Sequence, residues 1–292
     1  MTGIPDQGWL RRWLGALALV AGLAGCGGAT PVWSTGVDET LAAKVPAAIR
    51  AAGVITIGTD PTYAPSEFLD SDGKTVIGFD VDLFNAVAAK LGLTTQWQSA
   101  TFDSIIPGVS SKKYNVGVSS FTVNPKREQE ATMVTYFNAG TQWAAKKDAS
   151  IDPDNACGKK VAVQTATVQV DDLTARSKKC TDSGKPAITA DQYQAQSDAT
   201  SAVVSGKDDA MLADSPVCAY AVKQTNGQLA LVGQIYDSAP YGYVLPKDQS
   251  DFGDAIASAV KALIADGSYQ KILDKWGVTA GAITSPAVNP SA

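Results

Sequence analysis

The chain has 292 residues, of which 45% are hydrophobic and 18% charged, and its formal net charge is −5 at pH 7. It contains no histidine, which excludes Ser–His and Cys–His nucleophile pairs, histidine metal sites and the commonest general base. The acidic balance, without a basic stripe interleaved with aromatic residues, argues against nucleic acid as a partner. We therefore expect neither a metal nor a cofactor.

The N-terminal segment 1–25 has the composition of a secretory signal. An arginine pair at 11–12 precedes an apolar run at 13–23, which is too short to span a bilayer. The run ends in Leu-Ala-Gly-Cys, which resembles the lipobox of bacterial lipoproteins, so we predict lipidation of Cys26. Residues 26–50 would then form the anchor and linker of a domain on the extracytoplasmic face of the cell membrane. A simple cleaved signal is the alternative, and export by either the general or the twin-arginine route stays open.

Two sets of strands and helices follow in chain order. The first set alternates apolar strands with amphipathic helices, at 54–58, 80–91, 94–98, 102–109 and 115–119. The second set repeats the alternation, at 161–164, 167–176, 187–189, 197–205, 210–212 and 215–224. Strand–helix–strand order implies parallel pairing with helices packed on the sheet, so we expect two α/β lobes. A last strand at 242–245 and two amphipathic helices after it need a partner core, which the first lobe offers.

Three cysteines remain besides Cys26, so at least one of them is unpaired. Cys157 and Cys180 lie in polar, loop-like surroundings on either side of one strand–helix unit. We therefore predict a disulfide between them, which contributes roughly 3 kcal/mol in the loop-entropy model. Cys218 falls at a predicted helix start and is expected to be a small buried side chain. Three free core thiols are the alternative.

The stretch from Val118 to Arg127 is the strongest indication of a binding site. It ends an apolar strand in the hydroxyl residues Ser119, Ser120 and Thr122 and places an arginine beyond them. This cluster suits a ligand carboxylate, because a guanidinium makes bidentate, charge-assisted contacts and hydroxyls take the remaining lone pairs. A strand end followed by a solvated turn is the alternative.

Residues 54–278 resemble the ABC-importer substrate-binding proteins for polar amino acids, solute-binding protein family 3. The most specific phrases are ITIGTDPTYAP at 55–65 and GFDVDL at 78–83. The resemblance implies a two-lobe, type II periplasmic-binding-protein-like α/β fold, with a mostly parallel, helix-flanked sheet in each lobe and hinge crossings at 142–145 and 236–241. The implied boundaries are lobe 1 at 51–142 and 239–280, lobe 2 at 146–235, and a flexible tail at 281–292.

The same resemblance assigns the two ends of a bound amino acid. It implies that Arg127, helped by Ser120 and Thr122, binds the α-carboxylate and that Asp214 binds the α-ammonium. Asp214 follows a strand at the mouth of the cleft, where open α/β sheets bind ligands. Its alternative role is to cap the following helix. The lobe-two loop departs from the family's usual glycine–threonine phrase, which leaves open the exact contacts of Gln164, Val168 and Gln169. Ala166 can still offer its N–H, and Thr167 is a further candidate.

The side-chain end of the ligand is expected near Asp60. This residue stands where relatives that take lysine, arginine or histidine place an acid, and Glu67 lies close behind it. Tyr63 and Phe102 stand where relatives sandwich the ligand, and aromatic walls suit a guanidinium. We therefore expect a cationic amino acid, with glutamine or another neutral polar amino acid as the alternative. Asp60 as a structural acid and Phe102 as a core residue are also open.

Two other functions share the implied scaffold. A cyclohexadienyl dehydratase would need a carboxylic acid near the leaving hydroxyl, for which Glu67 is the only candidate. A ligand-free sensor domain is the other. We expect instead a non-enzymatic importer subunit that acts as a monomer, is held to the membrane by its N-terminal lipid, and passes a free amino acid to a separately encoded permease and ATPase.

Overall fold

The computed structural model describes residues 36–291, so the predicted signal segment and Cys26 lie outside the described residues. No helix within 36–291 is both long and apolar enough to cross a membrane. The described chain begins with two short helices, α1 (Glu39–Ala42) and α2 (Ala47–Ala52). Side chains from this region, including Ile49, join the core beneath β1 (Val54–Thr59). The end of the predicted linker at 26–50 is therefore part of the folded domain.

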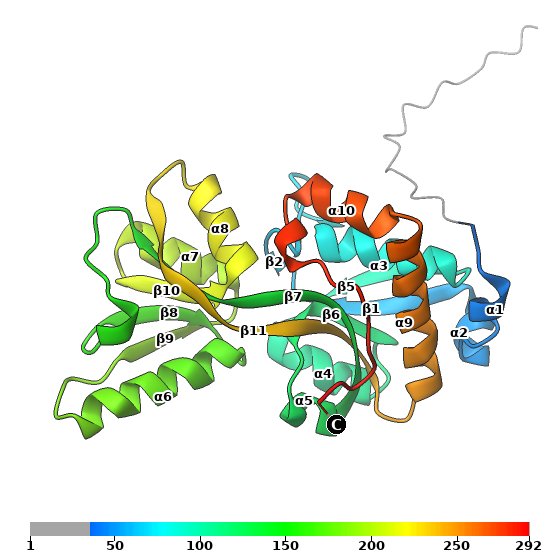
Figure 1. The fold of residues 1–292 in the computed structure, drawn as a ribbon, viewed down its shortest axis with the longest axis horizontal. Helices are drawn as coiled ribbons and strands as arrows, with labels where there is room; N and C mark the ends of the chain where they lie inside the picture. The colour runs from blue at the N-terminus through cyan, green and yellow to red at the C-terminus, as the bar shows by residue number, and fades with distance from the viewer. Residues whose placement is uncertain (1–35, 292) are drawn as a thin grey trace, which may run out of the picture. The chain divides into compact units, whose positions relative to one another are not determined.

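One eight-stranded sheet organises the described chain, in the order β5-β1-β6-β11-β7-β10-β8-β9 (Figure 1). Its other strands are β5 (Thr94–Ser99), β6 (Val116–Thr122), β7 (Ala131–Lys146), β8 (Lys160–Gln164), β9 (Thr189–Tyr193), β10 (Ala210–Asp214) and β11 (Leu229–Pro246). β1 pairs in parallel with β5 and β6, and β8 pairs in parallel with β9 and β10. We call the elements packed on β5-β1-β6 lobe 1 and those packed on β10-β8-β9 lobe 2. The expected pair of parallel α/β lobes is confirmed.

Two long antiparallel strands run through both lobes and connect them. β7 has 16 residues and β11 has 18, and they pair with each other from end to end. β11 also pairs with β6 in lobe 1, and β7 also pairs with β10 in lobe 2. The crossing predicted at 142–145 lies at the lobe-2 end of β7, where it pairs with β10, and the one predicted at 236–241 lies within β11. The β11 register shifts on both sides of Tyr236, so the ladder is irregular near the second crossing.

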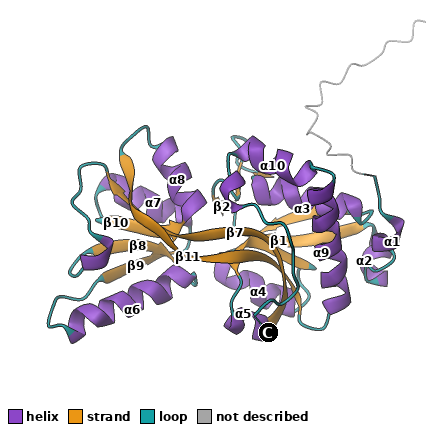
Figure 2. Ribbon diagram, in the orientation of Figure 1, coloured by secondary structure: helices purple, strands orange, loops and turns teal. Residues whose placement is uncertain are grey.

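The helices of lobe 1 cover both faces of its sheet (Figure 2). α3 (Phe79–Lys90), α9 (Ser250–Ala265) and α10 (Ser268–Trp276) share one core, and α4 (Phe102–Ser110) contributes to a second core on the other face. Along α3, Leu83 and Val87 are spaced four residues apart and therefore point to the same side. The prediction that the C-terminal helices return to lobe 1 is confirmed.

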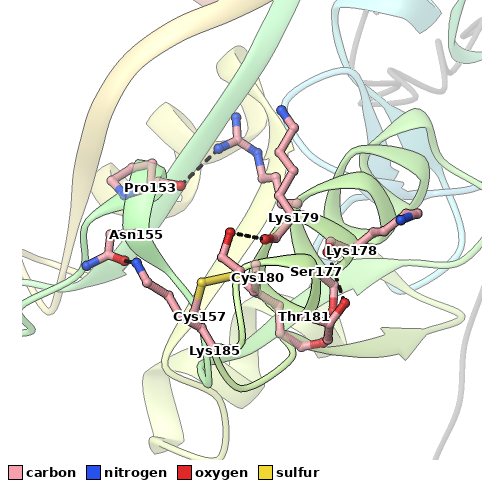
Figure 3. The surroundings of a disulfide bond; sticks show 12 residues. Pro153, Asn155, Cys157, Ser177, Lys178, Lys179, Cys180, Thr181 and Lys185 are labelled. Atoms are coloured by element: carbon pink, nitrogen blue, oxygen red, sulfur yellow. Dashed lines mark hydrogen bonds between the residues drawn. A yellow bond between two sulfur atoms is a disulfide. The ribbon is translucent and has the colours of Figure 1, made fainter.

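Lobe 2 is also a three-layer unit. α7 (Gln196–Ser205) and α8 (Ser215–Gln224) pack on one face of its strands, and α6 (Val168–Asp182) packs on the other. Figure 3 shows the predicted Cys157–Cys180 disulfide, which ties the loop before β8 to the last turns of α6, with Cα atoms 5.6 Å apart. Cys218 is buried in α8 as a free thiol. Both cysteine predictions are confirmed.

Three features differ from the sequence predictions. A small antiparallel sheet, β2 (Thr62–Tyr63), β3 (Glu67–Leu69) and β4 (Val76–Ile77), was not predicted, because its strands are too short to show a periodic pattern. The strand predicted at 187–189 instead begins at Thr189 and ends at Tyr193. The tail predicted to be flexible pairs with β7: the Thr135 N–H donates to the Ala287 carbonyl and the Asn289 N–H to the Met133 carbonyl. In lobe 1 β7 is an edge strand, and the tail covers that edge.

Candidate functional site

A small cavity lies between the two lobes, where β6 and β10 end and α4 and α6 begin. Its volume is about 10 Å³, so its walls nearly meet, and its lining contains twelve of the fourteen residues that the sequence predicts as ligand-binding. These twelve are Asp60, Tyr63, Phe102, Ser119, Ser120, Thr122, Arg127, Gln164, Thr167, Val168, Gln169 and Asp214. A larger hollow between α8 and α10 is lined by Lys223 and Lys275 but, among the described residues, by no acidic side chain. The polar cavity is therefore the better candidate for a site that binds a zwitterion.

Arg127 occupies one end of this cavity. It lies in the short helix α5 (Pro125–Glu130), whose N-terminus is capped by the Asn124 side chain. Its Nη1 donates to the Thr122 carbonyl at 2.8 Å and its Nη2 to the Ala166 carbonyl of lobe 2 at 3.2 Å. Burial lowers the pKa of Arg127 to about 10, so the guanidinium stays charged at neutral pH. Two of its five N–H donors are used in these bonds, and the others are available to a carboxylate.

The N-terminus of α6 lies beside Arg127. Ala166 adopts a left-handed backbone conformation with φ 63°, and the Thr167 hydroxyl donates to the Gln164 carbonyl at 2.8 Å. This turn starts the helix at Val168, which lines the cavity together with Gln169. The first N–H groups of a helix have no intrahelical acceptor and favour an anion. Together with Arg127, this end of the cavity suits a carboxylate.

Asp214 lies at the end of β10 and accepts three side-chain hydrogen bonds. Its Oδ2 accepts from the Tyr63 hydroxyl at 2.9 Å and from the Tyr241 hydroxyl at 2.7 Å, and its Oδ1 accepts from Gln169 Nε2 at 2.7 Å. Burial raises the pKa of Asp214, while these three bonds oppose that rise. Although Asp214 occupies the N-cap position of α8, its carboxylate makes no capping bond among those described in residues 36–291. The capping alternative is not supported.

Asp60 follows β1 and lies at another wall of the cavity. Its carboxylate accepts from the Thr62 hydroxyl at 2.8 Å, the Phe102 N–H at 3.0 Å and Gln164 Nε2 at 2.9 Å. A carboxylate has about four lone-pair sites, so one remains for a ligand. Phe102 is the first residue of α4, so Asp60 also binds the N-terminus of this helix. Asp60 therefore has a structural role as well as a place in the lining. Burial raises the pKa of this carboxyl above its ordinary value.

Direct hydrogen bonds join the lobes around the cavity. Besides the bonds Tyr63–Asp214, Asp60–Gln164 and Arg127–Ala166, the Gln196 N–H at the start of α7 donates to the Thr62 hydroxyl at 3.1 Å. The lobes are therefore in contact through the same side chains that form the lining.

Two of the predicted residues lie outside the lining. Ala166 lies at the outer mouth, where only its carbonyl contacts Arg127. Glu67 lies behind the cavity, fully buried, and accepts from the Ser119 hydroxyl at 2.9 Å. The sequence prediction that Glu67 contacts the ligand is therefore not supported by its position.

Sequence reasoning also missed two residues of this region. Tyr241 gives no local signal, since it lies in a strand whose partners are distant in sequence. Asp80 is buried behind the cavity and accepts from the Tyr136 hydroxyl at 2.6 Å. The GFDVDL phrase at 78–83 contains Asp80 and was the available signal for it.

Comparison with known proteins agrees with this geometry. Residues 55–279 match the family described as bacterial extracellular solute-binding proteins, family 3. The arginine-binding protein ArgT of Corynebacterium glutamicum is 40% identical over 250 residues, which are 85% of this chain and 82% of that protein.

Solved structures with the same fold include an ancestral arginine-binding protein. A structure of an ancestral arginine-binding protein bound to arginine has a TM-score of 0.71 and 32% identity, and one bound to glutamine has a TM-score of 0.71 and 30% identity. Each comparison covers 77% of this chain and 98% of the other. The two-lobe fold, the polar cavity between the lobes and the match over most of the chain together lead to one conclusion: the protein belongs to the bacterial extracellular solute-binding proteins, family 3.

Proposed function

We propose that this protein captures arginine, or another cationic amino acid, in the cavity between its lobes and delivers it to an ABC permease. The charge of the lining is the observation that carries this proposal. Asp60 and Asp214 supply two carboxylates and Arg127 one guanidinium, so the lining has one net negative charge. A zwitterion with a cationic side chain neutralises that charge, whereas glutamine leaves it and glutamate adds to it.

The proposed orientation pairs each charged group of the ligand with a group of opposite charge in the lining. The α-carboxylate lies at Arg127 and the N-terminus of α6, and the α-ammonium lies at Asp214. The side-chain cation lies at Asp60. Both acids have raised pKa values because of burial, and a bound cation offsets this desolvation. The relatives named for arginine support this choice of ligand.

We propose that the protein is not an enzyme. A dehydratase would need a proton donor in contact with its substrate, and Glu67 is separated from the cavity by Ser119.

We also propose that the protein is anchored by a lipid on Cys26 at the extracytoplasmic face of the cell membrane. In this proposal it works as a monomer with a separately encoded permease and ATPase.

A thermal-shift screen followed by titration calorimetry tests the ligand. Arginine and lysine should raise the midpoint of unfolding more than glutamine or glutamate, because a ligand that binds only the folded state stabilises it. At a free concentration 100 times the Kd the expected stabilisation is about 2.7 kcal/mol. Tighter binding of glutamine or glutamate than of arginine would reject the cationic assignment, and no binding of any amino acid would reject the function.

A further inference from the structure

Two buried carboxyl groups lie behind the cavity, Glu67 on β3 and Asp80 on α3. Both are 0% exposed. Glu67 Oε1 accepts from the Ser119 hydroxyl at 2.9 Å, and Asp80 Oδ2 accepts from both the N–H and the hydroxyl of Ser120 at 3.2 Å and from Tyr136 at 2.6 Å. The second oxygen of each group, Glu67 Oε2 and Asp80 Oδ1, has no hydrogen-bond partner among residues 36–291.

Within residues 36–291, no lysine or arginine forms an ion pair with either carboxyl group. The other titratable groups that influence them are acids as well: Asp60, Tyr136 and Tyr243. Two adjacent buried carboxylates cannot both be ionised without a large free-energy cost, so one of them keeps a proton.

The two oxygens without a donor indicate where that proton lies. Burial, and then the neighbouring Asp80 carboxyl, raise the pKa of Glu67 well above its ordinary value, and a hydrogen bond between the two groups contributes. Burial raises the pKa of Asp80 to about 6, and hydrogen bonds from Tyr136, Glu67 and Ser120 oppose the rise. A protonated Glu67 that donates to Asp80 satisfies both orphan oxygens at once.

We propose that Glu67 and Asp80 share one proton and that this acid–carboxylate pair positions Ser119 and Ser120 for ligand binding. A serine hydroxyl has one hydrogen and two lone pairs. Ser119 gives its hydrogen to Glu67, and Ser120 gives its hydrogen to Asp80. Both hydroxyls can therefore only accept from a ligand, so this wall of the cavity selects the N–H groups of an ammonium or guanidinium and disfavours a carboxylate.

Asp80 also holds the backbone of Ser120 in place. Ser120 has a φ of 52°, in the left-handed region that side chains other than glycine rarely adopt. The bond from its N–H to Asp80 compensates that conformation and fixes the direction of the neighbouring peptide group. Glu67 and Asp80 are thus positioning residues that act through the serines. This inference rests on the proposed function and revises the earlier expectation that Ser120 assists the α-carboxylate.

Conservative substitution of Glu67 tests the shared proton. In Glu67→Gln the amide N–H replaces the acid O–H toward Asp80, and the amide oxygen can still accept from Ser119. Glu67→Leu removes both bonds. Titration of the purified proteins with arginine at neutral pH should show Glu67→Gln binding at least about tenfold more tightly than Glu67→Leu. Equal losses in both variants would show that Glu67 acts as a carboxylate and would overturn the proposal.

Two further measurements separate positioning from simple packing. Infrared spectroscopy at neutral pH should show a protonated carboxyl band in the wild type that Glu67→Gln lacks. Arginine affinity should fall more steeply with rising pH in the wild type than in Glu67→Gln, because only the wild type loses the shared proton, whereas Arg127 and the ligand ammonium titrate in both proteins. A wild type without the band overturns the proposal. If the wild type shows the band but binds no arginine, the proposed function fails and the shared proton stands.

Discussion

The hydroxyl of Tyr63, in lobe 1, donates to Asp214 Oδ2, in lobe 2, at 2.9 Å. The Tyr63 ring also packs into the lobe-2 core, in the same cluster as Ala199 and Val217. One side chain of lobe 1 is therefore a buried part of lobe 2, and its polar end contacts the acid that we assign to the ligand ammonium. Binding and contact between the lobes thus share a group, which links ligand affinity to closure of the cleft.

Arg127→Ala should abolish arginine binding while the fold persists. Truncating one partner of a buried charge pair costs about 2–5 kcal/mol, which corresponds to roughly thirty- to several-thousand-fold in affinity. Titration calorimetry measures the loss, and circular dichroism checks the fold. Arg50→Ala, the same change at an exposed position in α2, is the matched control. Wild-type affinity in Arg127→Ala would remove this residue from the site.

Asp60→Asn should weaken the binding of arginine far more than that of glutamine. Only a cationic side chain loses a charged partner, while the asparagine oxygen can still accept from the Phe102 N–H. Calorimetric titrations of both ligands measure the difference. Asp251→Asn, on the exposed side of α9, should leave both affinities alone. Equal losses for the two ligands would mean that Asp60 supports the structure only.

Tyr63→Phe should reduce affinity without removing the aromatic wall. The variant loses only the hydroxyl that bonds Asp214 across the lobes, and hydrogen bonds to charged groups contribute about 1.5–3 kcal/mol, or roughly ten- to a hundredfold. Small-angle scattering should show that saturating arginine reduces the radius of gyration of the wild type, and that the variant needs more arginine to reach the same value. Tyr220→Phe is a control from α8. If Tyr63→Phe binds arginine and closes like the wild type, the Tyr63–Asp214 bond does not couple ligand affinity to closure of the cleft.

The free energy of unfolding should fall as the pH rises above about 4.5, the ordinary pKa of a glutamate. Because the pKa of Glu67 is raised in the folded protein, the folded state holds this proton after the unfolded chain has released it, and stability then decreases with pH. Denaturant titrations of the wild type and Glu67→Gln across this range measure the effect. The free energy of unfolding of Glu67→Gln should depend less on pH than that of the wild type. If the two proteins show the same pH dependence, the pKa of Glu67 is not raised in the folded state.

Much of the site could be predicted because its parts are local in sequence. Ser119, Ser120, Thr122 and Arg127 lie on one strand end and the turn after it, so a single phrase brings them together. The disulfide between Cys157 and Cys180 could also be predicted from the sequence, because both cysteines flank one strand–helix unit.

Long-range contacts could not be predicted in the same way. β7 and β11 pair over their full lengths although about 100 residues separate them in sequence. Local hydrophobic periodicity therefore predicted only short parts of these strands, such as 242–245. Tyr241 reaches Asp214 from one of these strands. Local periodicity reports which side chains are buried but not which buried groups meet.

The sequence by itself determined the family, the two α/β units and the identity of most residues around the cavity. Only the tertiary structure decided that Glu67 lies behind Ser119 rather than against the ligand, and that Asp80 is buried behind the neighbouring Ser120. Glu67, Asp80 and Ser119 come from a short strand, a helix start and a central strand. Their chemistry depends on the burial and mutual distance of the carboxyl groups, which exist only after these three elements have packed together.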